Sequence, residues 1–417
     1  MAMIKKAVKG MRDVTPEEMR LRNHVSDVIR EIYESYGFTQ IETPCVEHIE
    51  NLSSKQGGEN EKLIFKILKR GNKLDIANAK EENDLADSGL RYDLTVPLCR
   101  YYADHAAELP QPFKALQMGN VFRADQPQKG RFRQFEQCDI DILGEPSNLA
   151  EIELILAMST VLTRLSFKNF NIRINDRRIL KSMAAWAGFA EADYDAVFII
   201  LDKMDKIGVE GVIEELEKAG YAKENASKYM ELFRLLEGKA GEEALKALSE
   251  RMGEALSAEG RSNLEEIFSA VNAAKKDGWT LLFDPTLVRG MSYYTGTIFE
   301  VELKEFHSSC GGGGRYDEMI GRFTGQQTPA CGFSIGFERI ITILMEQGYQ
   351  LPDEKEKTAF LLEKGLPAEK VNEAMSRAEE LRAEGKCVQL LRMAKNKKFQ
   401  KEQLAAQGYT EIKEYFR

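Results

Sequence analysis

Apolar residues recur at helical spacing over residues 15–37 and predict a long amphipathic helix. The apolar stripe consists of Val25, Val28, Ile29, Ile32 and Tyr36. Thr15 can cap this helix, Pro16 fits its first turn, and Glu18 would complete a capping box. Gly37 suits the end of the helix, because glycine readily adopts the left-handed conformation that closes many helices.

Three later segments predict strands. Residues 38–45 form the first, in which Pro44 marks an edge or a break, because proline cannot donate to a sheet. Residues 113–123 and 131–144 form the other two, and the loop between them contains Pro127.

The last of these segments has two distinct faces from Gln134 onward. One face carries Phe135, Gln137, Asp139 and Asp141. The other face carries Cys138, Ile140 and Ile142. The apolar face should pack inside the protein, which leaves the aromatic, amide and carboxylate groups on the opposite face. If the same alternation of side chains continues through the turn, the polar face also includes Arg123, Asp125, Arg131 and Arg133.

The middle of the chain changes character. Residues 185–280 are rich in alanine, glutamate, lysine and leucine, which predicts an inserted helical domain. Strand character returns at 297–303, and residues 330–347 predict a strand that enters an apolar helix. Beyond Pro352 the segments TAFLLEK, KCVQLLRM and TEIKEYF predict strands separated by two helices, a small parallel or mixed α/β domain.

Composition narrows the class of protein. A chain of 417 residues with 43% hydrophobic and 30% charged residues fits two or three globular domains. It contains no run of 18 apolar residues, and its start lacks the apolar centre of a signal peptide. The six cysteines are scattered and form no CxxC pair, so we expect neither disulfides nor a zinc site, and a reducing cytoplasm. The net charge is -9, yet residues 386–417 carry eight basic and three acidic residues. This excess fits either a solvated helix face, which charge alone favours, or a surface for a polyanionic partner.

The predicted hairpin gathers unusual positive charge for so acidic a chain. Arg123, Lys129, Arg131 and Arg133 fall within eleven residues. Guanidinium groups suit phosphate oxygens, and Phe135 offers a face on which a base can stack. Asp139 and Asp141 suit a cationic or N–H-rich ligand. The alternative is an exposed hairpin whose charges form salt bridges.

Three glycine-containing motifs follow. LVRGMSYYTG (287–296) places an arginine before a tyrosine pair, although tyrosine pairs often serve packing. The glycines of SSCGGGGRYD (308–317) let the backbone approach a ligand or another strand, and GFSIGFER (332–339) lies at a strand-to-helix junction. None of them is a dinucleotide-binding GxGxxG before a helix, and both GxxxxGK[ST] and HExxH are missing from the sequence.

Together these motifs resemble the histidyl-tRNA synthetases, a class II aminoacyl-tRNA synthetase family. The resemblance covers nearly the whole chain in the family's order: KGMRDVTPEE (9–18), YGFTQIETPCVE (36–47), LRYDLTVPLCRY (90–101), the hairpin 122–144, INDRRILKSM (174–183), LVRGMSYYTG, GGGRYD and GFSIGFERI. It implies an α+β fold with an antiparallel sheet flanked by helices. The catalytic core would comprise residues 1–180 and 281–350, with a helical insertion at 181–280 and an anticodon-binding-like α/β domain at 355–417.

The resemblance also implies an ATP site. Arg123 would hold the α-phosphate and Arg131 the terminal phosphates. Phe135 and Arg339 would sandwich the adenine, and Asp125 stands where the family has a glutamate near the nucleotide. Mg²⁺ would bridge phosphates, without a protein motif of its own for a metal.

A histidine site is implied beside it. Three side chains would bind the amino group: Asp93, Thr95 and Gln137. Asp141 and Tyr294 would contact the imidazole, with Tyr316 nearby, and Arg289 would lie between the histidine carboxylate and the α-phosphate. Arg289 and Arg123 would thus act on the reacting atoms.

The family further implies a homodimer and tRNA(His) as partner, with no membrane association. Candidate tRNA contacts are Gln126, Gln128, Lys129, Lys395, Lys397 and Lys398. The chain departs from the family at Ser292, where an aspartate is common, and at ADQ (124–126), where HER is common. Its C-terminal domain is shorter than the five-stranded unit of the family.

Two other functions stay open on sequence grounds. One is a synthetase-like regulatory subunit of ATP phosphoribosyltransferase, which typically lacks both the arginine of the RGxxYY motif and the anticodon-binding domain. The other is an inactive tRNA-binding or signalling relative. The chain keeps Arg123, Arg131, Arg289 and Arg339, which favours the histidine–tRNA ligase.

Overall fold

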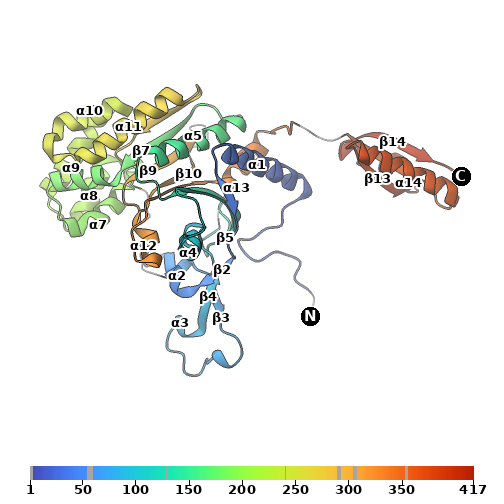
Figure 1. Ribbon diagram of the computed structural model, residues 1–417, viewed down its shortest axis with the longest axis horizontal. Helices are drawn as coiled ribbons and strands as arrows, with labels where there is room; N and C mark the ends of the chain where they lie inside the picture. The colour runs from blue at the N-terminus through green and yellow to red at the C-terminus, as the bar shows by residue number, and fades with distance from the viewer. Residues whose placement is uncertain are drawn as a thin grey trace. The chain divides into compact units, whose positions relative to one another are not determined.

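The computed structural model describes residues 3–53, 60–127, 130–239, 241–288, 293–303, 308–352 and 356–417 (Figure 1). The chain divides into two compact units, Met1–Gly348 and Tyr349–Arg417, and each is described by itself. Among the described residues, no helix is both long and apolar enough to cross a lipid bilayer.

An eight-stranded sheet forms the centre of the first unit. Its strands, in their order across the sheet, are β1 (Thr39–Ile41), β5 (Phe113–Phe122), β6 (Gln134–Leu143), β11 (Ala330–Ile335), β10 (Ser308–Arg315), β9 (Thr297–Leu303), β7 (Phe170–Asp176) and β8 (Trp279–Phe283). All neighbours are antiparallel except the outer pairs β1–β5 and β7–β8, which are parallel. The predicted α+β class with an antiparallel sheet is therefore confirmed.

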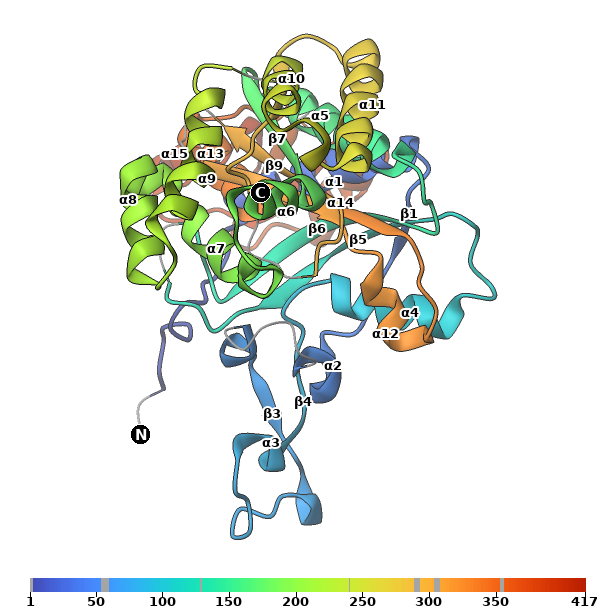
Figure 2. The ribbon, with the colours of Figure 1, turned by 90° about the vertical axis from the view of Figure 1, so that its left-hand side faces the viewer.

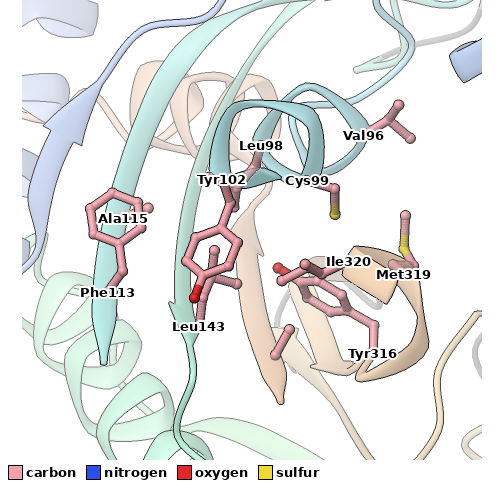
Figure 3. Packing of buried hydrophobic residues seen from close by; sticks show 11 residues of the cluster. Val96, Leu98, Cys99, Tyr102, Phe113, Ala115, Leu143, Tyr316, Met319 and Ile320 are labelled. Atoms are coloured by element: carbon pink, nitrogen blue, oxygen red, sulfur yellow. The ribbon is translucent and has the colours of Figure 1, made fainter. Parts of the chain in front are cut away.

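Helices cover both faces of this sheet. Besides α1 (Pro16–Ser35), the helices beside the central strands are α4 (Thr95–His105), α5 (Leu149–Arg164), α12 (Glu318–Thr324) and α13 (Phe337–Glu346). Helices α5 and α13 pack on the face of β6 that carries Cys138, Ile140 and Ile142, all buried. Helices α4 and α12 lie over the other face, where Tyr316 packs with Cys99 and Met319 (Figure 3).

Helix α1 (Pro16–Ser35) begins where the capping residues predict. The Thr15 hydroxyl accepts a hydrogen bond from the Glu18 amide at 3.4 Å. The predicted capping box is wrong, because the Glu18 carboxylate accepts from the Arg12 guanidinium at 2.6 Å instead. The following strand is also shorter than predicted: β1 ends at Ile41, three residues before Pro44.

A three-stranded antiparallel sheet forms an arm below the large one, visible in Figure 2. Its strands are β2 (Val46–His48), β4 (Ala86–Leu90) and β3 (Lys66–Leu68). Short helical turns accompany them: α2 (Ile49–Ser53), η1 (Asn60–Leu63), η2 (Gly71–Lys73) and α3 (Glu82–Leu85).

The predicted helical stretch is confirmed as helices. They are α6 (Arg177–Ala187), η3 (Glu191–Asp193), α7 (Tyr194–Leu201), α8 (Met204–Lys218), α9 (Lys223–Leu236), α10 (Gly241–Met252), η4 (Gly253–Ala255) and α11 (Ala258–Ala274). They belong to the first unit: α11 packs on α5 and α10 on β8. The boundaries of a separate insertion domain stay a prediction.

The second unit has the predicted βαβαβ order. Its elements are β12 (Lys357–Leu362), α14 (Ala368–Ala383), β13 (Cys387–Arg392), α15 (Lys397–Ala406) and β14 (Tyr409–Tyr415). The three strands are parallel, in the order β13-β12-β14. Alternate residues of β12 face opposite helices, since Phe360 packs toward α14 and Leu361 toward α15.

Candidate active site

A cavity of about 450 Å³ lies over the polar face of β6, beside β10, β11 and the loop of the β5–β6 hairpin. Its lining brings together the predicted nucleotide and histidine residues that the structure describes: Asp93, Thr95, Arg123, Asp125, Arg131, Phe135, Gln137, Asp141, Tyr294, Tyr316 and Arg339. These residues come from segments more than two hundred positions apart in the chain, and only the fold assembles them.

Asp141 is a buried carboxylate at the floor of this cavity. Its Oδ1 accepts a hydrogen bond from the Tyr316 hydroxyl at 2.5 Å. Burial and the neighbouring Asp139 raise the pKa of Asp141 well above its ordinary value, although the Tyr316 bond partly opposes this. Asp141 is therefore an acceptor held in one orientation, suited to an N–H group of a ligand.

Gln137, two positions before Asp139, offers a second acceptor. Its Nε2 donates to the Ser334 hydroxyl at 3.0 Å and to Asp139 Oδ2 at 3.2 Å. These bonds fix the orientation of the amide group. Its Oε1 is buried and has no hydrogen-bond partner within the described residues. An unsatisfied buried acceptor costs free energy, so a ligand that donates a hydrogen bond here would recover it.

Two further carboxylates face the cavity. Burial raises the pKa of Asp139 to about 7, and Asp93 adds to this by like-charge repulsion while Ser334 opposes it. Burial likewise raises the pKa of Asp93, whose Oδ1 accepts from the Val96 amide at 3.1 Å. Three buried carboxyl groups around one cavity favour a cationic or N–H-rich ligand.

Ser334 was missed among the predicted site residues, and Asp139 was expected to meet a cationic or N–H-rich ligand but received no specific role in the histidine site. The alternation along β6 already placed Asp139 on the correct face, so that signal was present. Ser334 pairs with Asp139 in the β11–β6 register, which a single sequence does not reveal. Tyr92, which also lines the cavity, immediately precedes Asp93.

Glycines make the floor of the cavity accessible. A Cβ on Gly332 would lie 1.9 Å from Asp141 Oδ1, and one on Gly314 would lie 2.9 Å from the Tyr294 ring. On Gly313, a Cβ would lie 1.9 Å from the Gly332 carbonyl oxygen of β11. The predicted close approach of the glycine-rich backbone to a neighbouring strand is therefore present.

Arg123 stands at the rim of the cavity between two aromatic rings. Its guanidinium lies 4.2 Å from the Tyr92 ring centroid and 5.1 Å from that of Phe135, and its Nε donates to the Tyr92 carbonyl at 3.1 Å. Stacking leaves the other guanidinium edge available to an anion.

The strand alternation that places side chains on the polar face does not extend to every arginine of the hairpin. Strand β6 begins only at Gln134, so Arg131 and Arg133 lie in the loop. The Arg133 Nε donates to the Asp125 carbonyl at 3.0 Å, and Arg133 is not part of the cavity lining. Arg131 does line the cavity, but its placement comes from the loop and not from strand alternation.

Arg339 lines the cavity from the first turn of α13. Its Nη1 donates to the Ser309 carbonyl of β10. Glu338, the preceding residue, is 8% exposed and accepts from both Arg22 nitrogens at 2.7 and 2.8 Å. Burial opposes ionisation of Glu338, but the Arg22 bonds outweigh it and lower the pKa of this carboxylate.

Several predicted residues lie elsewhere. Arg289, Ser292, Gln128 and Lys129 lie outside the described residues. Gln126 is exposed and does not line the cavity. Lys395, Lys397 and Lys398 are exposed at the start of α15 in the second unit. Within the described part of the chain, no group of three or more histidine, cysteine or acidic residues could hold a metal ion.

Comparison with known proteins gives one consistent result. The family model of histidyl-tRNA synthetase matches residues 10–340. A histidine–tRNA ligase of Leifsonia xyli subsp. xyli is 44% identical, over 96% of this chain and 93% of its own length. A histidine–tRNA ligase of Porphyromonas gingivalis is 38% identical, over 90% of this chain and 84% of its own length.

Solved structures agree with this result. The histidyl-tRNA synthetase of Nostoc sp. PCC 7120 superposes with a TM-score of 0.79 at 29% identity, covering 98% of this chain and 90% of that one. A Bacillus halodurans protein described as an ATP phosphoribosyltransferase regulatory subunit/histidyl-tRNA synthetase superposes with a TM-score of 0.80, covering 99% of both chains. At 23% identity that second likeness shows the fold alone. The family match, the curated relatives and the assembled cavity agree, and the chain belongs to the histidyl-tRNA synthetase family.

Proposed function

We propose that this protein is a histidine–tRNA ligase, which activates L-histidine with ATP and transfers it to the 3′ end of tRNA(His). The observation that carries the proposal is the cavity itself. It combines an unsatisfied buried amide oxygen on Gln137 and a fixed carboxylate on Asp141 with the guanidinium groups of Arg123 and Arg339. Such a cavity has one end suited to a cationic amino acid and another suited to phosphates and a base.

Histidine fits the acidic end of the cavity. Its ammonium group would donate to Gln137 Oε1, with the Asp93 carboxylate and Thr95 beside it. The neutral imidazole presents one donor and one acceptor, and its N–H would meet the Asp141 carboxylate. Tyr294 lines the same region, and its hydroxyl would serve the other ring nitrogen. Buried polar groups of this kind reject ligands that leave them unpaired.

ATP fits the basic end. The adenine would stack between Phe135 and Arg339, and Arg131 would neutralise the terminal phosphates. Mg²⁺ would be held mainly by phosphate oxygens, as this ion commonly is. Asp125 lines the same end of the cavity and is the candidate for a contact to the nucleotide.

The chemical step needs charge compensation more than proton transfer. A carboxylate oxygen of histidine forms a bond to the α-phosphorus, and the bond to the bridging oxygen breaks, so pyrophosphate leaves with the electron pair. Arg123 would stabilise the negative charge that develops on the α-phosphate. Arg289, predicted from the family motif to act beside it, would reduce the repulsion between the carboxylate and the phosphate. A terminal ribose hydroxyl of tRNA would then attack the histidyl-adenylate.

The test is histidine-dependent exchange of pyrophosphate into ATP. We expect exchange with wild-type protein, histidine and Mg²⁺, and loss of at least about a hundredfold in Arg289→Ala, since electrostatic groups on reacting atoms commonly contribute that much. Thermal unfolding of the variant should match the wild type. A wild-type protein without exchange would refute the proposal.

Transfer to tRNA is the second half of the same proposal. The basic run that includes Lys395, Lys397 and Lys398 would meet the phosphate backbone of the tRNA, and Gln126, Gln128 and Lys129 its acceptor end. A homodimer in the cytoplasm completes the proposed assembly. Charging of tRNA(His) by wild-type protein tests it, and exchange without charging would limit the proposal to histidine activation.

The regulatory-subunit alternative gains no support from a specific observation. The similarity of this chain to the Bacillus halodurans protein shows the fold alone, whereas the curated relatives named above are ligases. The exchange assay separates the two functions.

A further inference from the structure

The segment before α1 makes contacts that the proposed chemistry does not use. Residues 8–12 cross the base of the β5–β6 hairpin loop and touch both its return limb and the start of α13. Those two elements carry the arginines proposed for ATP, Arg131 in the loop and Arg339 in the helix. The segment therefore joins the two sides of the nucleotide end of the cavity.

Gly10 makes the first of these contacts through its backbone. Its carbonyl accepts from the Arg133 amide at 2.8 Å. A Cβ on Gly10 would lie 2.7 Å from Arg133 Cδ and 2.9 Å from Pro127 Cγ. Gly10 also has φ +84°, in the left-handed region that favours glycine. The approach of the segment to the loop thus depends on the absence of a side chain at Gly10.

Arg12 makes the second contact. Its guanidinium stacks over the Phe132 ring at 4.6 Å from the centroid, and Phe132 adjoins Arg131. The same guanidinium donates to Glu18 at 2.5 and 2.6 Å and to Glu338 at 3.2 Å. One side chain therefore connects the loop, helix α1 and the residue preceding Arg339.

Glu338 is the common anchor of this arrangement. Besides Arg12, it accepts two hydrogen bonds from Arg22 and one from the Glu136 amide at 3.2 Å. Removing Arg12 leaves this buried carboxylate with its Arg22 partner, so the helix start keeps its charge compensation. The contacts that disappear are the one between the loop and the helix and the two hydrogen bonds from Arg12 to Glu18 in α1.

We propose that Arg12, assisted by Gly10, is a positioning residue for ATP: it holds the loop that carries Arg131 at a fixed distance from Arg339. The inference rests on the proposed function, because it concerns the nucleotide of that reaction. Arg12 is not part of the cavity lining and acts through Phe132 and Glu338. It should therefore affect ATP and leave histidine binding unchanged.

The experiment compares KM values for the two substrates in pyrophosphate exchange. In Arg12→Ala we expect KM for ATP to rise by about tenfold to a hundredfold, as for displacements of about 1 Å at a reactive site, while KM for histidine stays within about twofold. Arg12→Lys keeps the charge but loses the planar fork and stacking face, so we expect only partial rescue. Gly10→Ala should reproduce the rise in KM for ATP.

Matched variants control for general damage. Arg30→Ala removes an arginine of similar exposure from α1, whose guanidinium donates hydrogen bonds to Asp27 and Gln40. Gly71→Ala changes a glycine of φ +60° whose Cβ would meet nothing within 4 Å. Both should leave the KM for ATP unchanged.

Two results would overturn the inference while wild-type exchange is present. One is an unchanged KM for ATP in Arg12→Ala and Gly10→Ala. The other is an equal rise of both KM values accompanied by a lower melting temperature, which would indicate a purely structural role. Absence of exchange in the wild type would instead refute the proposed function, so the two failures are distinguishable.

Discussion

The substitution Gly332→Ala tests the histidine end of the cavity without removing any charged group. Gly332 on β11 is paired with Asp141 on β6. Side chains paired across antiparallel strands usually stand beside one another with room for both. Here the Asp141 carboxylate leans over Gly332 to reach the Tyr316 hydroxyl, so Oδ1 lies 1.9 Å from where a Cβ would be.

The magnitude follows from the displacement that alanine requires. Ordinary contact begins at 3.4 Å, so Oδ1 must move by about 1.5 Å, and the 2.5 Å bond to Tyr316 is lost. Loss of a hydrogen bond to a buried acidic group costs about 1 to 3 kcal/mol. At about 1.4 kcal/mol per factor of ten, histidine affinity should fall by roughly fivefold to a hundredfold.

Calorimetric titration with histidine measures this directly, and KM for histidine in the exchange assay should rise in parallel. KM for ATP should change little, because the side chains next to Gly332 are Asp141 and Tyr316, which are assigned to histidine. Gly321→Ala in α12 is the matched control, since the atom nearest to its Cβ would be the Gln326 carbonyl oxygen, at 3.3 Å. Unchanged histidine affinity in a folded Gly332→Ala protein would refute the assignment of this space to the ligand.

Three further predictions concern buried acidic groups. In Tyr316→Phe, histidine affinity should fall by about tenfold with KM for ATP unchanged, because Asp141 loses its fixed orientation; equal affinities in a titration would contradict this. The folded pKa of Asp139, about 7, exceeds its ordinary value of 3.8, so the free energy of unfolding should fall as pH rises from about 4 to 7. In denaturant titrations, Asp139→Asn should flatten the pH dependence of the free energy of unfolding between about pH 4 and 7. Parallel pH profiles of the wild type and the variant would contradict this prediction. Finally, Glu151→Gln breaks the buried bidentate pair with Arg315 and should destabilise the protein by about 3 to 5 kcal/mol in chemical denaturation. The control is Glu31→Gln, whose exposed pair with Arg164 should contribute little to stability. Equal losses of stability in the two variants would contradict this prediction.

The sequence predicts most of the elements and one important face. Alternation in β6 works because the strand is regular and its apolar side is fully buried, so Gln137, Asp139 and Asp141 must lie together on the other side. The same parity fails for Arg133, since the strand begins after it and its backbone is held by Gly10 and Arg123. Loop positions depend on such specific contacts and not on a period.

Contacts between distant segments lie beyond any periodic signal. The Tyr316 hydroxyl reaches Asp141 across 175 positions of sequence, and Arg22 reaches Glu338 across 316. The first contact requires the order of strands across the sheet, in which β11 and then β10 lie beside β6 although β7, β8 and β9 come between them along the chain. Family resemblance names such residues in advance, but the partner that orients each one is visible only in the fold.

The glycine-rich strand shows why local preference and the site disagree here. A run of glycines weakens a strand, at about 0.5 to 1 kcal/mol for each residue relative to alanine, yet β10 lies in the middle of the large sheet. Neighbours on both sides supply its hydrogen bonds, and the buried Arg315–Glu151 pair fixes its end. Gly312 lines the cavity, and a Cβ on Gly314 would lie 2.9 Å from the Tyr294 ring, so side chains on this strand would crowd the site. The glycines of β10 thus make a poor strand, but they leave open the floor that the proposed amino acid and nucleotide sites need. A sequence rule that scores β10 by propensity alone would reject the strand on which the proposed site depends.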